Sequence, residues 1–198
     1  MKKIDYFSDE IDYIKDDNNK KDLITLINLL PDYFFKVPAS STGKYHPEFA
    51  LGDGGLYRHT KVVSKIVMEL LEIEDRFLDN DKDLLVMAAV MHDGFKYGIE
   101  CNKYTRFDHP LICSKIIMEN AKKFILDINN LRKLCMMIES HMGKYNKDYH
   151  SDIVLPLPRN ELERFLHRCD YLASRKFLGI KFDNFKIVDF KEEKNEKK

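Results

Sequence analysis

The sequence of 198 residues has no excess of charge of either sign and no long apolar run. Lysine and arginine total 33, as do aspartate and glutamate, so the surplus of cations on which binding of long nucleic acids depends is missing. The longest apolar run, residues 84–91, is much shorter than the roughly 20 residues that cross a bilayer. We therefore expect neither a binder of long nucleic acids nor a protein that spans a membrane.

Closely spaced cysteine pairs are also missing. The four cysteines lie 12, 22 and 34 positions apart, which excludes a zinc ribbon or a redox pair of the Cys-x-x-Cys type. We expect reduced thiols packed in the core at Cys101, Cys113, Cys135 and Cys169. The first six residues turn acidic before an apolar signal-peptide core could form, so we expect a cytoplasmic protein.

The chain is apolar enough to fold by itself. Hydrophobic residues make up 44% of it, which predicts a single domain over residues 1–198 with a solvated tail at 191–198. Apolar residues recur at helical spacing and predict an all-α bundle of about six or more helices. Five of the expected helices cover residues 23–30, 59–71, 108–124, 127–141 and 160–177. Another lies between the second and third of these, begins at a cap formed by Asp81 or Asp83, and ends at 91–93. A long loop at 36–57 and a short β-hairpin within 179–190 complete the expected fold.

Several polar residues interrupt the apolar faces of these helices. His59, His92 and His141 continue the apolar stripes of three different predicted helices, and Asp170 continues the stripe of a fourth. A single buried histidine is usually a satisfied core residue, but a buried carboxylate is costly unless it is paired or binds a metal. Imidazoles and carboxylates that converge from separate helices therefore predict a site for a divalent metal ion.

Four segments carry a family resemblance. Residues 54–60 read GGLYRHT, residues 91–96 read MHDGFK, residues 139–143 read ESHMG and residues 169–174 read CDYLAS. The ordered series of His59, the His92-Asp93 pair and Asp170 resembles the H…HD…D signature of the HD-domain superfamily of metal-dependent phosphohydrolases. The resemblance covers about residues 37–178. One departure is Gly94-Phe95 after Asp93, where members commonly have a small apolar residue and then glycine.

The resemblance implies an all-α bundle that binds one metal ion through His59, His92, Asp93 and Asp170. Members with two ions add histidines between the HD pair and the last aspartate, and His109 and His141 occupy suitable places. Asp93 would then bridge the two ions. For His141 the alternative is core packing or substrate contact, and for His109 it is exposure at a helix start. The resemblance favours Mn²⁺ or Fe²⁺, and the mixed donors also admit Co²⁺, Zn²⁺ or Mg²⁺.

A phosphorylated substrate needs cationic and N–H donors in addition to a metal. Lys96, three residues after Asp93, is the leading candidate, and the two make up the predicted catalytic pair. A further set of residues is predicted to bind the substrate: Ser41, Thr42, Lys44, His46, Arg58 and Arg175. For each of them the alternative is structural, namely a turn in the loop at 41–46 and salt bridges for the two arginines.

These features predict a metal-dependent phosphohydrolase that cleaves a phosphoester of a mono-, tri- or cyclic nucleotide with metal-activated water. The expected partner is a small phosphorylated substrate. One alternative is an HD-type 3′→5′ exonuclease or phosphodiesterase that acts on short RNA or DNA. Two others are a nucleotide-binding sensor without catalysis and a purely structural helical module.

Overall fold

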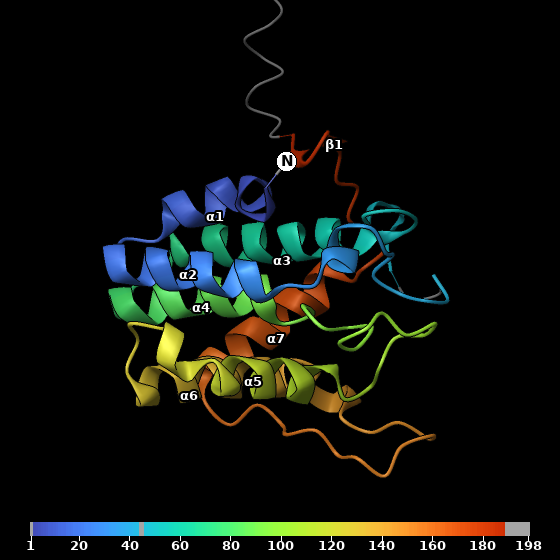
Figure 1. Ribbon diagram of the computed structural model, residues 1–198. Helices are drawn as coiled ribbons and strands as arrows, with labels where there is room; N and C mark the ends of the chain where they lie inside the picture. Colours follow the sequence, from blue (N-terminus) through green and yellow to red (C-terminus); the bar gives the residue numbers. More distant parts are fainter. Residues whose placement is uncertain (1, 44–45, 189–198) are drawn as a thin grey trace, which may run out of the picture.

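The fold is built almost entirely from helices, as the sequence predicts (Figure 1). The computed structural model describes residues 2–43 and 46–188, and within them seven α-helices and one two-stranded sheet are formed. The helices are α1 (Ser8–Tyr13), α2 (Asp17–Leu29), α3 (Gly55–Leu71), α4 (Asp79–Met91), α5 (His109–Glu119), α6 (Ile128–Ser140) and α7 (Glu161–Ala173). The sheet pairs β1 (Phe182–Asp183) with β2 (Lys186–Ile187). Short 3₁₀ helices lie at Lys3–Phe7, Asp32–Phe35, Glu48–Ala50, Ala121–Lys123 and Gly143–Tyr145.

Three helices begin at a side chain that caps them. Asp16 accepts hydrogen bonds from the main-chain N–H groups of Asn18 and Asn19, so α2 begins well before the predicted start at residue 23. Asp127 and Asn160 cap α6 and α7 in the same way, close to the predicted starts of these helices. Short polar side chains at helix starts therefore fix most of the expected boundaries.

The predicted cap of α4 is wrong, because α4 begins at Asp79 and has Leu78 at its cap position. Asp83 lies inside the helix and is buried. Its carboxylate accepts hydrogen bonds from the main-chain N–H groups of Lys15 and Asp16, at 3.1 and 3.2 Å. The residue expected to cap α4 thus ties this helix to the segment between α1 and α2.

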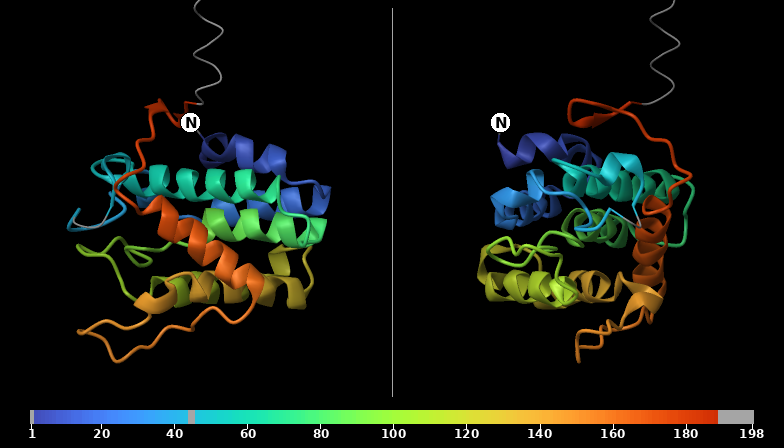
Figure 2. Two further views of the ribbon diagram at one scale, coloured as in Figure 1. Left: turned by 180° about the vertical axis from the view of Figure 1, so that it is seen from behind. Right: turned by 90° about the vertical axis from the view of Figure 1, so that its right-hand side faces the viewer.

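The helices pack in layers around one core (Figures 1 and 2). Helices α3 and α4 lie side by side, α2 packs on α4, and the α5–α6 pair joins through α6 to the other side of α4. Helix α7 crosses this stack and contacts α3, α4 and α6, as the view from behind in Figure 2 shows. The core contains apolar side chains without exposed surface, among them Leu26, Ile27, Leu56, Val63, Leu85, Val90, Leu134, Ile138 and Leu166.

The loops that precede or follow the candidate site residues gather at one end of this stack. The segments 36–43 and 46–54, 92–108 and 141–160 all reach the side drawn at the right in Figure 1 and at the left in the rear view of Figure 2. Loops there can approach a ligand while the helices hold the buried side chains in place. The fold therefore directs the predicted site to this end.

Two glycines let the loop before α3 fold tightly onto that helix. Gly54 has a φ of +71°, a conformation that glycine adopts without strain. A Cβ atom on Gly55 would lie 2.2 Å from the carbonyl oxygen of Ala50, so only glycine allows this approach of the two main chains. The GG pair of the segment at 54–60 is therefore required by the backbone that leads into α3.

The C-terminal hairpin is present as predicted and covers the same loop. Phe182 pairs with Ile187 in the hairpin, and the ring of Phe182 packs 6.2 Å from that of Phe49. The hydroxyl of Tyr57 donates a hydrogen bond to the carbonyl oxygen of Phe185. The predicted solvated tail at 191–198 lies outside the described residues. Over residues 2–43 and 46–188, no helix combines the length and the apolar character needed to cross a membrane.

Candidate metal centre

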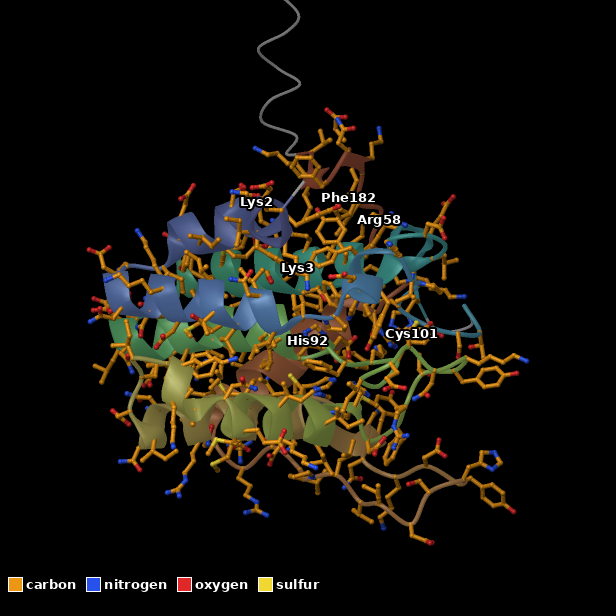
Figure 3. All side chains as sticks on the ribbon, in the orientation of Figure 1. Lys2, Lys3, Arg58, His92, Cys101 and Phe182 are labelled. Atoms are coloured by element: carbon orange, nitrogen blue, oxygen red, sulfur yellow. The ribbon has the colours of Figure 1, made fainter. Side chains whose placement is uncertain are left out.

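Three helices bring together the first group of candidate ligands. His59 lies on α3, His92 directly follows α4, and Asp170 lies on α7. The Nε2 atom of His59 is 3.1 Å from Oδ1 of Asp170, and the Nε2 atom of His92 is 3.7 Å from the same oxygen. Ligand atoms of all three residues lie within 4.8 Å of one another, so the group could hold a metal ion. Figure 3 shows His92 in the interior of the bundle.

A second group adjoins the first through Asp93. Oδ2 of Asp93 lies 3.6 Å from Nε2 of His59 and 3.5 Å from Nε2 of His92, which places this oxygen beside the first group. Oδ1 of Asp93 lies 2.9 Å from Nε2 of His109 and 3.5 Å from Nε2 of His141. His92, Asp93 and His141 form a second set of three residues that could hold a metal ion. The two oxygens of one carboxylate thus face two different sets of imidazoles.

The main chain fixes the orientation of three of these imidazoles. The Nδ1 atom of His92 lies 2.7 Å from the carbonyl oxygen of Ala89, three residues earlier. His109 and His141 make the same contact, also at 2.7 Å, with the carbonyl oxygens three residues before them. Because a carbonyl oxygen can only accept, Nδ1 must carry the proton in each ring, and Nε2 is the atom left to bind a cation.

Burial keeps two of these rings in the form that binds metals. Burial lowers the pKa of His92 to about 4 and also lowers the pKa of His109, so both imidazoles are neutral near neutral pH. Burial opposes the charged form of His141, but the adjacent carboxylates of Asp93 and Asp170 raise the pKa of this ring above its ordinary value. His141 is therefore the ring that the carboxylates most favour as a cation.

The two carboxylates stay ionised although Asp93 is buried and Asp170 is half-buried. Burial alone would raise the pKa of Asp93, but Lys96 and the surrounding histidines hold it well below its ordinary value. Burial likewise opposes ionisation of Asp170, but the hydrogen bond from His59 and the nearby His92 lower its pKa. One negative charge thus lies between the two histidine sets, at Asp93, and the other lies beside His59 and His92, at Asp170.

The donor atoms of this cluster fit a metal ion. Nε2 of His92 and Oδ1 of Asp93 are buried and have no hydrogen-bond partner among the described residues. In a neutral ring, Nε2 of His109 also presents a lone pair to Oδ1 of Asp93. Buried lone pairs that face one another without a proton are unfavourable, and a divalent cation is the group that stabilises all of them.

Lys96 adds a positive charge at the edge of the cluster. Its Nζ atom lies 2.5 Å from Oδ2 of Asp93, and its side chain is 13% exposed, so part of the side chain reaches solvent. Its main-chain N–H donates to the carbonyl oxygen of Asp93, within the turn that follows α4. The sequence predicted Lys96 close to Asp93, and the structure places it there.

Of the predicted substrate-binding residues at 41–46, His46 lies beside the cluster of candidate ligands. The ring of His46 is 5.2 Å from that of His59, and its Nδ1 atom is buried without a hydrogen-bond partner. Burial and the charge of Lys96 lower the pKa of His46 to about 3. Ser41 is exposed, Thr42 contacts Ser40 at 3.4 Å, and Lys44 lies outside the described residues. The substrate contacts predicted for these loop residues remain predictions.

Arg58 supports the loop that precedes α3. Its three guanidinium nitrogens donate to the main-chain carbonyl oxygens of Phe49, Leu51 and Asp53, at 2.5 to 2.8 Å. These bonds use three of the five N–H donors of the guanidinium and tie Arg58 to the loop before α3. A contact between Arg58 and a substrate stays a prediction. Figure 3 shows Arg58 close to Phe182 of the hairpin.

Arg175 is also engaged locally, at the end of α7. Its Nε atom donates to the carbonyl oxygen of Tyr171 at 3.1 Å, and its guanidinium lies 4.1 Å from the centre of the Tyr171 ring. A contact between Arg175 and a substrate stays a prediction. The buried thiols of Cys113, Cys135 and Cys169 agree with the sequence interpretation, whereas Cys101 is exposed.

Sequence reasoning missed one contact of the site. His167, on α7, has its Nδ1 atom 2.7 Å from the carbonyl oxygen of His141. The signal available in the sequence was its position three residues before Asp170, on the same side of α7. That signal does not reveal the partner, which lies 26 positions away in the chain.

Comparison with known proteins gives one match. The model of a family described as HD domain matches residues 56–175, which is more than half of the chain and includes every candidate metal ligand. No curated protein and no solved structure matches the chain.

Proposed function

Because the chain belongs to the HD-domain family, we propose that it is a metal-dependent phosphohydrolase that cleaves a phosphoester of a nucleotide. The observation that carries this proposal is the convergence of four histidines and two carboxylates on adjoining groups of ligand atoms. Members of this family are generally metal-dependent hydrolases. The nucleotide is proposed by analogy with other members, because a fold alone does not specify a substrate.

The chemistry requires a polarised phosphate and an activated water. A divalent ion, for which we favour Mn²⁺ or Fe²⁺, lowers the pKa of a bound water and withdraws charge from a phosphoryl oxygen. Asp93 holds its two oxygens toward the two histidine sets, so it fixes the distance between them. Lys96 offers an ammonium group to a phosphoryl oxygen at the edge of the cluster. His46 packs edge-to-face against His59 and can donate or accept one hydrogen bond through Nδ1.

One observation favours a second candidate function, the cleavage of short single-stranded RNA or DNA. The exposed tyrosines of the described chain lie in the loops at 92–108 and 141–160 or directly after Asp170: Tyr104, Tyr145, Tyr149 and Tyr171. Tyr149 is 97% exposed on the loop between α6 and α7. Exposed aromatic rings beside a phosphate site can stack successive bases, which a mononucleotide would not need.

The proposal is tested by loading the purified protein with Mn²⁺ and measuring product release. The panel contains nucleoside mono- and triphosphates, cyclic nucleotides and short oligoribonucleotides. Asp93→Asn keeps the volume of the side chain and removes the charge that both histidine sets face, so it should abolish metal binding and hydrolysis. Asp75→Asn, at an exposed position between α3 and α4, is the matched control and should behave as wild type.

Each outcome decides between the candidate functions. Hydrolysis of a nucleotide that is lost in Asp93→Asn supports the proposal. Hydrolysis that is confined to oligonucleotides supports the second candidate. Bound Mn²⁺ without activity on any compound of the panel favours a nucleotide-binding sensor. Full activity of Asp93→Asn contradicts the assignment of the site.

A further inference from the structure

The side chain of His167 contacts the main chain of a candidate metal ligand, His141. Its Nδ1 atom lies 2.7 Å from the carbonyl oxygen of His141. Because this oxygen accepts, Nδ1 is the donor and fixes the tautomer of the ring. The residue belongs to α7 and is half-buried, so α7 itself sets the position of its donor.

Gly143 makes this contact possible from the other side. The ring of His167 lies where a side chain at position 143 would begin, since a Cβ atom there would be 2.2 Å from the ring. Gly143 also has a φ of +55°, a conformation that favours glycine. The turn after α6 is therefore shaped to receive the ring of His167.

The held carbonyl belongs to a residue of the second group of ligand atoms. His141 directly follows α6, where its Nδ1 atom bonds to Ile138 and its Nε2 atom lies 3.5 Å from Oδ1 of Asp93. Release of the carbonyl would free the last turn of α6 to move, and the imidazole would move with it. Helix α7 thus supplies Asp170 to the first group and, one turn earlier, steadies His141 in the second.

From these contacts we infer that His167 is a positioning residue for the second metal ion, acting through His141. This inference rests on the proposed function, because it requires the two groups to bind ions. It assigns His167 no contact with a substrate. Its loss should weaken the second ion about 10-fold, the lower end of the effect of residues that orient metal ligands, and should leave the first ion nearly unchanged.

The test measures Mn²⁺ binding rather than activity. Metal-free wild type, His167→Ala, His167→Gln and the control His150→Ala are equilibrated with increasing Mn²⁺, and bound metal is counted by mass spectrometry. The electron paramagnetic resonance signal of a coupled Mn²⁺ pair reports the second ion separately. We expect the pair signal of His167→Ala to require about 10-fold more Mn²⁺. His167→Gln, which retains an N–H donor, should recover part of this loss.

A second variant disturbs the same contact from the other side, and the Tm of each variant is compared with that of wild type to detect a folding defect. Gly143→Ala pushes the ring of His167 away without changing that residue, so it should weaken the second ion as His167→Ala does. An unchanged pair signal in both variants overturns the inference. Equal weakening of both ions also overturns it, because it indicates a general structural role. A wild type that binds a single ion overturns it as well, but leaves the proposed hydrolase intact.

Discussion

The ammonium group of Lys96 and Oδ2 of Asp93 lie 2.5 Å apart, on a turn in which the two residues are three positions from each other. The same oxygen faces the imidazoles of His59 and His92. Lys96 therefore shares its carboxylate partner with a metal ion bound by the first group. Its side chain also has a solvent-facing edge toward which it can swing to meet a phosphate.

Removing the charge of Lys96 should slow hydrolysis more than it weakens metal binding. Lys96→Met keeps the length of the side chain and removes its positive charge, and we expect kcat to fall about 100-fold, as for the loss of one donor to a developing oxyanion. Mn²⁺ content should stay at the wild-type level. Steady-state kinetics and metal analysis of the same samples check this. Loss of bound metal in Lys96→Met would show that Lys96 supports the site and not the substrate.

Replacing Arg58 should lower stability and leave substrate binding unchanged. Arg58→Ala leaves the carbonyl oxygens of Phe49, Leu51 and Asp53 without their donors, at a cost of about 1–3 kcal/mol. For a chain of this length, each kcal/mol lowers Tm by about 2–4 °C, which calorimetry resolves. KM, measured well below the melting transition, should not change. A large rise in KM with an unaltered Tm would restore the predicted contact between Arg58 and the substrate.

The buried pair of Lys61 and Glu10 should be costly to break from one side. Nζ of Lys61 lies 2.6 Å from Oε2 of Glu10, and both side chains are buried. Lys61→Met leaves the carboxyl group without its partner and should destabilise the protein by about 3–5 kcal/mol in urea unfolding. The double variant with Glu10→Met should recover most of this loss, because no charge is then left in the core. Equal stability of the single and double variants would contradict this pairing.

Glu10 should also make stability depend on pH. Burial raises the pKa of its carboxyl group above the ordinary value, despite the nearby Lys61. The folded protein therefore keeps this proton at pH values where the unfolded chain has lost it, so stability falls as the pH rises from about 4.3, the pKa in the unfolded chain, up to the raised pKa of the folded protein. The side chain of Glu10→Gln cannot titrate, so the free energy of unfolding of this variant should rise relative to that of wild type between pH 4 and pH 7. Urea titrations at three pH values measure this difference, and a constant difference would disprove the assignment.

The residues of the site could be predicted from the sequence, because their signal is local. Histidines that continue an apolar stripe must face the core, and His59, His92 and His141 do so. The division of labour between the oxygens of Asp93 could not be predicted, since it depends on how α3, α5 and α6 meet around one residue. Nor could the engagement of Arg58, whose partners lie in an irregular loop.

Charged residues account for much of what the sequence concealed in the fold. Helix α1 was not predicted, because its buried residue is Glu10, which a hydropathy pattern assigns to the surface. Its partner Lys61 lies 51 positions away, so no local pattern links the two. Asp83 misled in the same way, since a buried acceptor for distant N–H groups has the same sequence signature as a helix cap.

His59 and Asp170 meet at 3.1 Å although 111 positions separate them in the chain. The contact requires α7 to be docked on α3, so a metal ion bound by the first group would have its full set of ligands only after α7 has docked. Long-range contacts of this kind form late and slowly during folding. A metal that binds only the folded protein also stabilises the folded state relative to the unfolded state. We therefore expect the rate at which this protein binds metal to report the last step of its folding.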